Sequence, residues 1–93
     1  PGLGLHLDTG QMIEEGLDPV EVVSLHAADL IHLHLSAPDF SCRPDLLPVY
    51  ADVIQVLRGA SCHADVVLEV QSLGGATESE MVGVCRQLRA LLS

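Results

Sequence analysis

The sequence predicts an α/β fold built from three consecutive βα units whose strands are parallel. Three short apolar runs, at 3–7, 30–35 and 66–70, have the length of buried strands. Longer segments follow them, and the apolar residues of those segments recur every three or four positions, as one buried helix face requires. Strands that alternate with such helices are typical of βαβ units. Hydrophobic residues make up 48% of the chain, which is too high for a disordered segment.

The first unit begins with the strand at 3–7 and continues through a polar turn at 8–10. A helix follows, for which Asp18 supplies the N-cap and Pro19 the first helical position.

The second unit joins the strand at 30–35 to a helix over about 45–58, through a loop rich in Ser, Pro and Asp. Pro48 falls in the first turn of this helix, where proline is tolerated, and Gly59 is a good C-terminal stop.

The third unit begins with the strand at 66–70 and a Gly-Gly loop. Thr77 then stands three residues before Glu80, which is the spacing of a capping box at the start of the last helix.

Strand parity favours a closed barrel over an open sheet. Side chains alternate between the two faces of a strand, so Ile31, Leu33 and Leu35 are expected on one apolar face. The opposite faces carry ionisable residues that gather toward the strand ends: His6, Asp8, His32, His34 and Glu69. An open parallel sheet that is covered by helices on both sides would need two apolar faces. The inside of a TIM (β/α)8 barrel can instead be polar at its mouth, where active sites lie.

Asp8, His34 and Glu69 would point into that mouth from three adjacent strands. Buried carboxylates are costly unless they are paired or bind a cation. Two carboxylates beside an imidazole suit Mn²⁺, Mg²⁺, Co²⁺ or Zn²⁺ better than a soft metal. The residues alone therefore leave two alternatives, which are a divalent-metal site and a hydrogen-bonded polar network without an ion.

Charge and cysteine content exclude several classes of function. The net charge is −9, with four Arg and no Lys, which argues against binding to nucleic acid or to anionic membranes. No apolar run approaches the roughly 20 residues of a membrane span. Cys42, Cys62 and Cys85 are widely spaced and odd in number, so we expect free thiols in a reducing cytoplasm.

Three phrases of the sequence resemble one family. They are Gly-Leu-His-Leu-Asp-Thr-Gly at 4–10, Ile-His-Leu-His at 31–34 and Val-Leu-Glu at 67–69. Together they look like strands six, seven and eight of the xylose-isomerase-like TIM barrels, which include ketose 3-epimerases, other sugar and inositol isomerases or dehydratases, and DNA-repair enzymes of the endonuclease IV type. The resemblance implies that 1–93 is a partial domain, the C-terminal three βα units of a longer barrel, since a complete barrel needs roughly 250 residues.

By that resemblance, Asp8, His34 and Glu69 are similar to the metal ligands of strands six, seven and eight. Glu69 is also similar to one of the family's two acid/base carboxylates, and the other Glu ligand would come from an earlier strand. The implied function is a divalent-metal-dependent isomerase or epimerase of a small sugar or polyol, with proton transfer through an enediolate.

Substrate contacts are expected from Gln11 and Arg43, with His6 and His32 one pleat deeper on the same face. Gln11 stands where the family often has the histidine of an Asp-x-x-His pattern. A glutamine can hydrogen bond a substrate hydroxyl but cannot act as an acid or base near neutral pH. The absence of that histidine counts against the DNA-repair branch, which needs several extra zinc ligands.

Two other functions stay open. Gln11 points to a non-catalytic or diverged barrel of the same family, and a metal-dependent lyase or phosphodiesterase on the same fold is a further alternative, because fold does not fix function. The expected partners are a sugar-like substrate, the remainder of the barrel and, as an open alternative, further copies of the chain. Three βα units leave two open sheet edges, so we expect this segment alone to be neither a stable monomer nor active.

Overall fold

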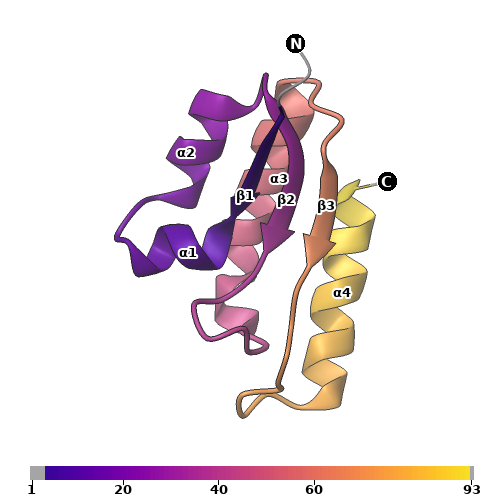
Figure 1. Ribbon diagram of the computed structural model, residues 1–93. Coiled ribbons are helices and arrows are strands. Elements are labelled where there is room, and N and C mark those ends of the chain that lie inside the picture. Colours follow the sequence, from indigo (N-terminus) through magenta and orange to yellow (C-terminus); the bar gives the residue numbers. More distant parts are fainter. Residues whose placement is uncertain (1–3, 93) are drawn as a thin grey trace.

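The computed structural model describes residues 4–92 as a parallel sheet with helices along it (Figure 1). The elements in chain order are β1 (Leu5–Asp8), α1 (Thr9–Glu14), α2 (Pro19–His26), β2 (Leu30–Leu35), a 3₁₀ turn η1 (Pro44–Leu46), α3 (Leu47–Gly59), β3 (Asp65–Leu68) and α4 (Glu78–Leu92). The strands form one three-stranded sheet of order β1-β2-β3, and both pairings are parallel. The predicted alternation of parallel strands with flanking helices is thus confirmed, while its origin in a TIM barrel stays a prediction.

The hydrophobic core lies on one face of this sheet. Figure 1 shows α3 behind the strands, with α2 and α4 on either side of it. Leu33 and Leu35 of β2 are almost fully buried beneath these helices. No helix of residues 4–92 crosses the face that is turned toward the viewer. His32 and His34 alternate with the buried Leu33 and Leu35 and are half-buried, and His6 is exposed. One apolar and one polar face per strand is the arrangement that the alternation of residue types predicts.

Ile31 departs from the predicted parity. The pairing of β1 with β2 shifts register between Leu5 and His6, so that Leu5 pairs with Leu30 and His6 with His32. Ile31 is the extra residue of this bulge, and a bulge turns the side chains around it. Ile31 is therefore 52% exposed and lies against Gly4, and Leu30, at 4%, takes its place in the core.

Two of the predicted helix starts are confirmed, the helix predicted from about 45 begins at Leu47 after the 3₁₀ turn η1, and one additional helix appears. The Asp18 carboxylate accepts a hydrogen bond from the N–H of Val20 at 3.0 Å, as an N-cap should. Thr77 and Glu80 form the reciprocal capping box, with bonds of 2.9 and 3.0 Å. The expected polar turn at 8–10 is instead the start of α1, because Asp8 caps that helix.

The loops that follow β2 and β3 are joined to each other beyond the ends of the strands. The N–H of Gln71 donates to the carbonyl of Phe40 at 2.6 Å, and the N–H of Cys42 donates to that of Ser72 at 2.8 Å. Ser41 and Ser72 form an isolated parallel bridge. The backbone pairing of β2 with β3 is thereby extended past the carboxyl ends of both strands.

The structure also bears on two expectations drawn from composition. Over residues 4–92, no helix combines the length and apolarity needed to cross a bilayer. Cys42, Cys62 and Cys85 are all free thiols, as expected from their spacing.

Candidate metal centre

The carboxyl ends of the three strands bring the predicted ligands together. Asp8, the last residue of β1, is the register partner of His34 in β2. Glu69 directly follows β3, and its N–H donates to the carbonyl of Leu35 at 2.9 Å, which continues the β2–β3 ladder by one more bond. Asp8, His34 and Glu69 are each half-buried, and one ligand atom from each lies within 4.8 Å of the other two. These side chains therefore lie together at one end of the sheet, as the sequence predicts.

His34 and Glu69 are in direct contact. The Nδ1 atom of His34 lies 3.0 Å from Oε2 of Glu69, and the two side chains are 35% and 32% exposed. Neighbouring ligands of an octahedral cation with bonds of 2.0–2.1 Å are also about 3.0 Å apart. The same separation suits a direct hydrogen bond between an imidazole and a carboxylate. The donor types and the separation of His34 from Glu69 therefore fit a small divalent cation, and they equally fit the polar network that the sequence left open.

Asp8 is held in place through one of its two oxygens. Its Oδ1 atom accepts hydrogen bonds from the N–H of Gly10 at 2.9 Å and of Gln11 at 3.3 Å, which makes Asp8 the N-cap of α1. The same oxygen accepts a hydrogen bond from the hydroxyl of Ser36 at 2.5 Å. Helix α1 and the residue after β2 thus fix the carboxylate jointly.

Ser36 is a contributor that was not predicted from the sequence. Thr9 and Ser36 are fully buried, and their contact is reciprocal: Thr9 Oγ1 donates to the Ser36 carbonyl and accepts from the Ser36 N–H, both at 2.9 Å. Gly10 packs so closely here that a Cβ on it would lie 2.6 Å from the carbonyl oxygen of Ala37. The available signal was parity, because Ser36 continues the alternation of the β2 histidines by one more step.

The histidines predicted to contact substrate lie beside the ligands. The rings of His6 and His32 stack with centroids 5.5 Å apart, and those of His32 and His34 lie 4.7 Å apart. These three rings line a hollow of about 150 Å³ together with Leu7 and Asp8. His6 and His32 are therefore neighbours of the triad on the same open face of the sheet.

Gln11 and Arg43, the other two predicted substrate contacts, lie in different surroundings. Gln11 lines a hollow of about 250 Å³ that His6 and Asp8 also border. The guanidinium of Arg43 is bound by both carboxylate oxygens of Asp45 at 2.9 and 2.7 Å, and this contact holds the pKa of Asp45 below its usual value. The structure brings Gln11 to the site and ties Arg43 to its own 3₁₀ turn.

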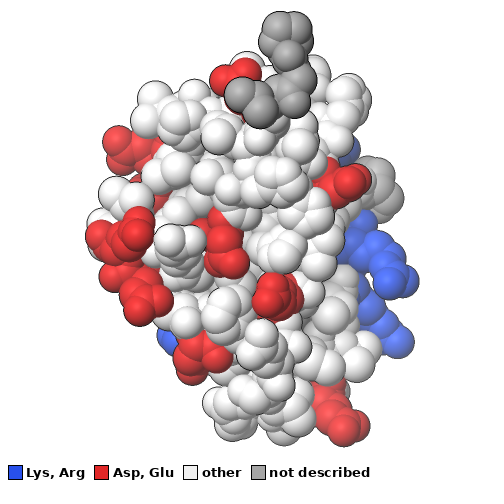
Figure 2. Space-filling model, viewed as in Figure 1, with Lys and Arg blue, Asp and Glu red and all other residues white. Residues whose placement is uncertain are grey.

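The charge distribution favours cations over anions. Figure 2 shows carboxylates spread over the left side and the centre of the visible surface, whereas most of the visible Arg atoms lie at the right edge, on the side of α4. With a net charge of −9, the chain offers an acidic field in which a divalent cation is attracted and a phosphate is repelled.

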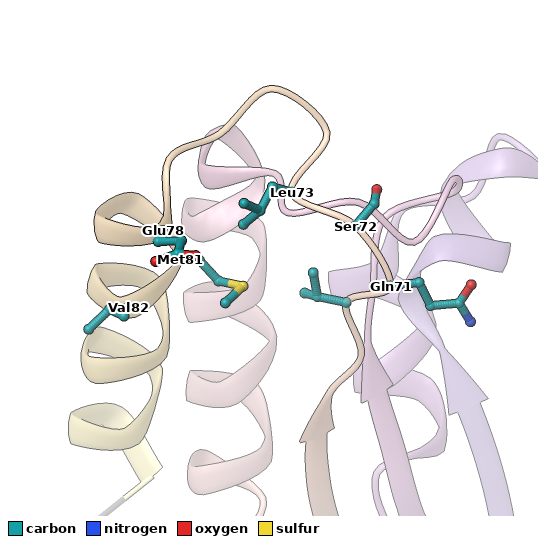
Figure 3. Close-up of a pocket in the computed structure, with 7 residues that line it drawn as sticks. Gln71, Ser72, Leu73, Glu78, Met81 and Val82 are labelled. Atoms are coloured by element: carbon teal, nitrogen blue, oxygen red, sulfur yellow. The ribbon is translucent and has the colours of Figure 1, made fainter.

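A separate apolar hollow of about 360 Å³ lies between the β3–α4 loop and α4 (Figure 3), and its walls are Val70, Gln71, Ser72, Leu73, Glu78, Met81 and Val82. Its one titratable residue is Glu78. In Figure 3 the side chain of Gln71 points away from Glu78 and Met81, toward the strands. The hollow lacks the convergent polar groups of a catalytic site, and the polar chemistry of the chain lies instead at the triad.

Comparisons of the chain with models of known protein families, with curated proteins and with solved structures give no match. They identify neither a xylose-isomerase-like family nor any other, so function has to be argued from the site itself.

Proposed function

We propose that the chain carries part of the active site of a divalent-metal-dependent isomerase or epimerase that acts on a small sugar or polyol. In this proposal residues 1–93 are the last three βα units of a TIM barrel, and the remainder of the barrel completes the site. The observation that supports it best is the meeting of Asp8, His34 and Glu69 at the carboxyl ends of three consecutive parallel strands. Barrel enzymes place their active sites at that end.

Asp8, His34 and Glu69 would hold the ion. A bound divalent cation would act as a Lewis acid toward a carbonyl oxygen and a neighbouring hydroxyl of the substrate. Two carboxylates and one imidazole match the preference of Mn²⁺, Mg²⁺, Co²⁺ or Zn²⁺.

Proton transfer is the task proposed for Glu69. A half-buried carboxylate at the site can accept the proton of a carbon next to a carbonyl and return it, provided that the substrate lies within hydrogen-bond reach. Gln11, on the rim beside Asp8, would orient a substrate hydroxyl through its amide. A second acid/base group is expected from another strand of the barrel.

Metal content tests the proposal first. We expect about one divalent ion per complete barrel that contains this chain, after exposure to Mn²⁺, Co²⁺ or Zn²⁺ and removal of excess ion, measured by elemental analysis. The double variant Asp8→Asn, Glu69→Gln should lose the ion, because it removes both anionic ligands. A matched control, Asp45→Asn with Glu78→Gln, removes the same charge from carboxylates outside the triad and should keep the ion.

No ion in the unaltered complete barrel with any of these metals would reject the metal site in favour of the polar network. Retention of the ion by the double variant would place the binding elsewhere on the chain.

A diverged, non-catalytic barrel is the second candidate, and Gln11 is the observation that favours it. The residue borders the same hollow as Asp8, at a position where a histidine would supply acid/base chemistry and a glutamine cannot. An ion bound at the triad of the complete barrel, with no turnover of ketoses or inositols, would favour this candidate over the isomerase.

A further inference from the structure

The two oxygens of the Asp8 carboxylate have different surroundings. Oδ1 accepts three hydrogen bonds, from the N–H groups of Gly10 and Gln11 and from the hydroxyl of Ser36, at 2.9, 3.3 and 2.5 Å. Oδ2 accepts no hydrogen bond from residues 4–92. Each carboxylate oxygen has about two lone-pair sites, so Oδ1 is fully occupied and Oδ2 is available.

The surroundings of Ser36 direct its hydroxyl proton to the Asp8 carboxylate. The residue is fully buried, and its Oγ accepts a hydrogen bond from the N–H of Gly10 at 3.2 Å while it donates to Asp8. Its backbone is held on both sides by the Thr9 hydroxyl. A hydroxyl has one proton to donate, and here the acceptor of that proton is determined by the fold.

This arrangement bears on which cation the site accepts. Ca²⁺ takes six to eight oxygen ligands at 2.3–2.6 Å and often binds both oxygens of a carboxylate. Mg²⁺ and ions of similar size take fewer ligands at shorter distances, commonly through a single oxygen of each carboxylate. A carboxylate that offers only Oδ2 therefore suits the smaller ions.

We propose that Ser36 determines the cation specificity of the Asp8–His34–Glu69 site by occupying Oδ1 and restricting Asp8 to one-oxygen coordination. The inference rests on the proposed function, because it requires that the triad binds a divalent cation. Ser36 acts through Asp8 and is a positioning residue, with no contact of its own to the ion.

The test compares the Mn²⁺ and Ca²⁺ affinities of the complete barrel that contains this chain, by isothermal titration calorimetry. We expect Ser36→Ala to weaken Mn²⁺ binding about 10-fold or more, as is usual when a group that orients a ligand is removed. Ca²⁺ binding should fall less or should strengthen, because Oδ1 becomes partly available. The ratio of the two affinities should therefore shift toward Ca²⁺ by about 10-fold.

Thr9→Val is the matched control. It removes the hydroxyl that hydrogen bonds both the N–H and the carbonyl of Ser36, and it should lower stability. It leaves the contact between Ser36 Oγ and Asp8 Oδ1, so the affinity ratio should not change. Should Ser36→Ala fail to fold, Ser36→Cys replaces the hydroxyl with a slightly larger and weaker donor and should give an intermediate ratio.

An unchanged ratio in a folded Ser36 variant that still binds Mn²⁺ would overturn this inference and leave the proposed metal site standing. An equal shift of the ratio in Thr9→Val would also overturn it, since a general loosening of the fold would then explain both. Absence of Mn²⁺ binding in the unaltered complete barrel would overturn the proposed function and this inference together.

Discussion

Tyr50 is the chain's single tyrosine, and it lies almost fully buried in α3 beneath the sheet. Burial raises its pKa to about 12, because the phenolate would lose its hydration inside the core. In the unfolded chain the group ionises near its ordinary value of about 10. Its contribution to stability is therefore complete below pH 10 and is lost as the pH rises toward 12.

Absorbance at 295 nm measures this titration directly, because the chain has no Trp and one Tyr. We expect a midpoint near pH 12 in the folded chain and near 10 in concentrated urea. Tyr50→Phe should remove the part of the alkaline destabilisation that arises between those values. A midpoint near 10 under native conditions would mean that the ring is not buried as described.

The meeting of Asp8, His34 and Glu69 was predictable from the sequence because it needs only two rules. Side chains alternate along a strand, and parallel strands end at the same edge of a sheet. The place of Ile31 was not predictable in this way, because one inserted residue in β2 changes the local parity and leaves no mark in the hydrophobicity pattern. Ser36 was missed because its role depends on a hydrogen bond between units that are 28 residues apart.

At the scale of single elements, two glycines differ in whether the fold requires them. Gly74, in the β3–α4 loop, has a φ of +57°, and a Cβ on it would lie 2.5 Å from the Cβ of Ser41. Gly83 lies inside α4, and a Cβ there would meet nothing within 4 Å. One glycine is required by the contact between the two loops, and the other weakens its helix.

We therefore expect Gly74→Ala and Gly83→Ala to change stability in opposite directions. Gly74→Ala should lower the free energy of unfolding by about 1–3 kcal/mol, through a left-handed backbone and a steric clash. Gly83→Ala should raise it by about 0.5–1 kcal/mol, since alanine loses less backbone entropy in a helix. Urea unfolding followed by circular dichroism at 222 nm, at equal protein concentrations, measures both. Stabilisation by Gly74→Ala would contradict the close approach of the two loops.

The hydrogen bonds between the β2–α3 loop and the β3–α4 loop could not be predicted from the sequence. The N-cap at Asp18 and the capping box of Thr77 and Glu80 are local signals, and α2 and α4 begin where those signals indicate. The bonds from Gln71 to Phe40 and from Cys42 to Ser72 join two segments of irregular backbone, for which composition alone carries no signal about partners.

For the whole molecule, the two unpaired edges of the sheet are expected to control self-association in solution. Among residues 4–92, β1 and β3 each pair with a strand on one side only. Leu25, Ile31 and Val67 are 74, 52 and 43% exposed. Unpaired parallel edges and exposed apolar side chains invite association, as the sequence already indicated.

We expect the isolated chain to self-associate, with a light-scattering mass that rises above 9.9 kDa as concentration increases. Leu5→Lys puts a charge on the outer strand β1 and should shift the population toward the monomer. Leu25→Lys adds the same charge on α2, outside the strands, and should have a smaller effect because it changes neither strand edge. A monodisperse monomer with a sharp, cooperative unfolding transition would contradict the expectation.

The hydrogen bonds between the β2–α3 and β3–α4 loops also decide where the polypeptide tolerates being cut. Loop tips are ordinarily the best places to nick or permute a chain, but a break near Ser41 or Ser72 would release the backbone that follows His34 and Glu69. Over residues 4–92, the α1–α2 turn at Gly16 and the turn at Ser61 after α3 bond only to the helix before them, since the N–H of Gly16 donates to the carbonyl of Ile13 and that of Ser61 to the carbonyl of Arg58. A Cβ on Gly16 would meet nothing within 4 Å, and Ser61 is exposed. New termini for split or circularly permuted versions of this chain belong at those two turns.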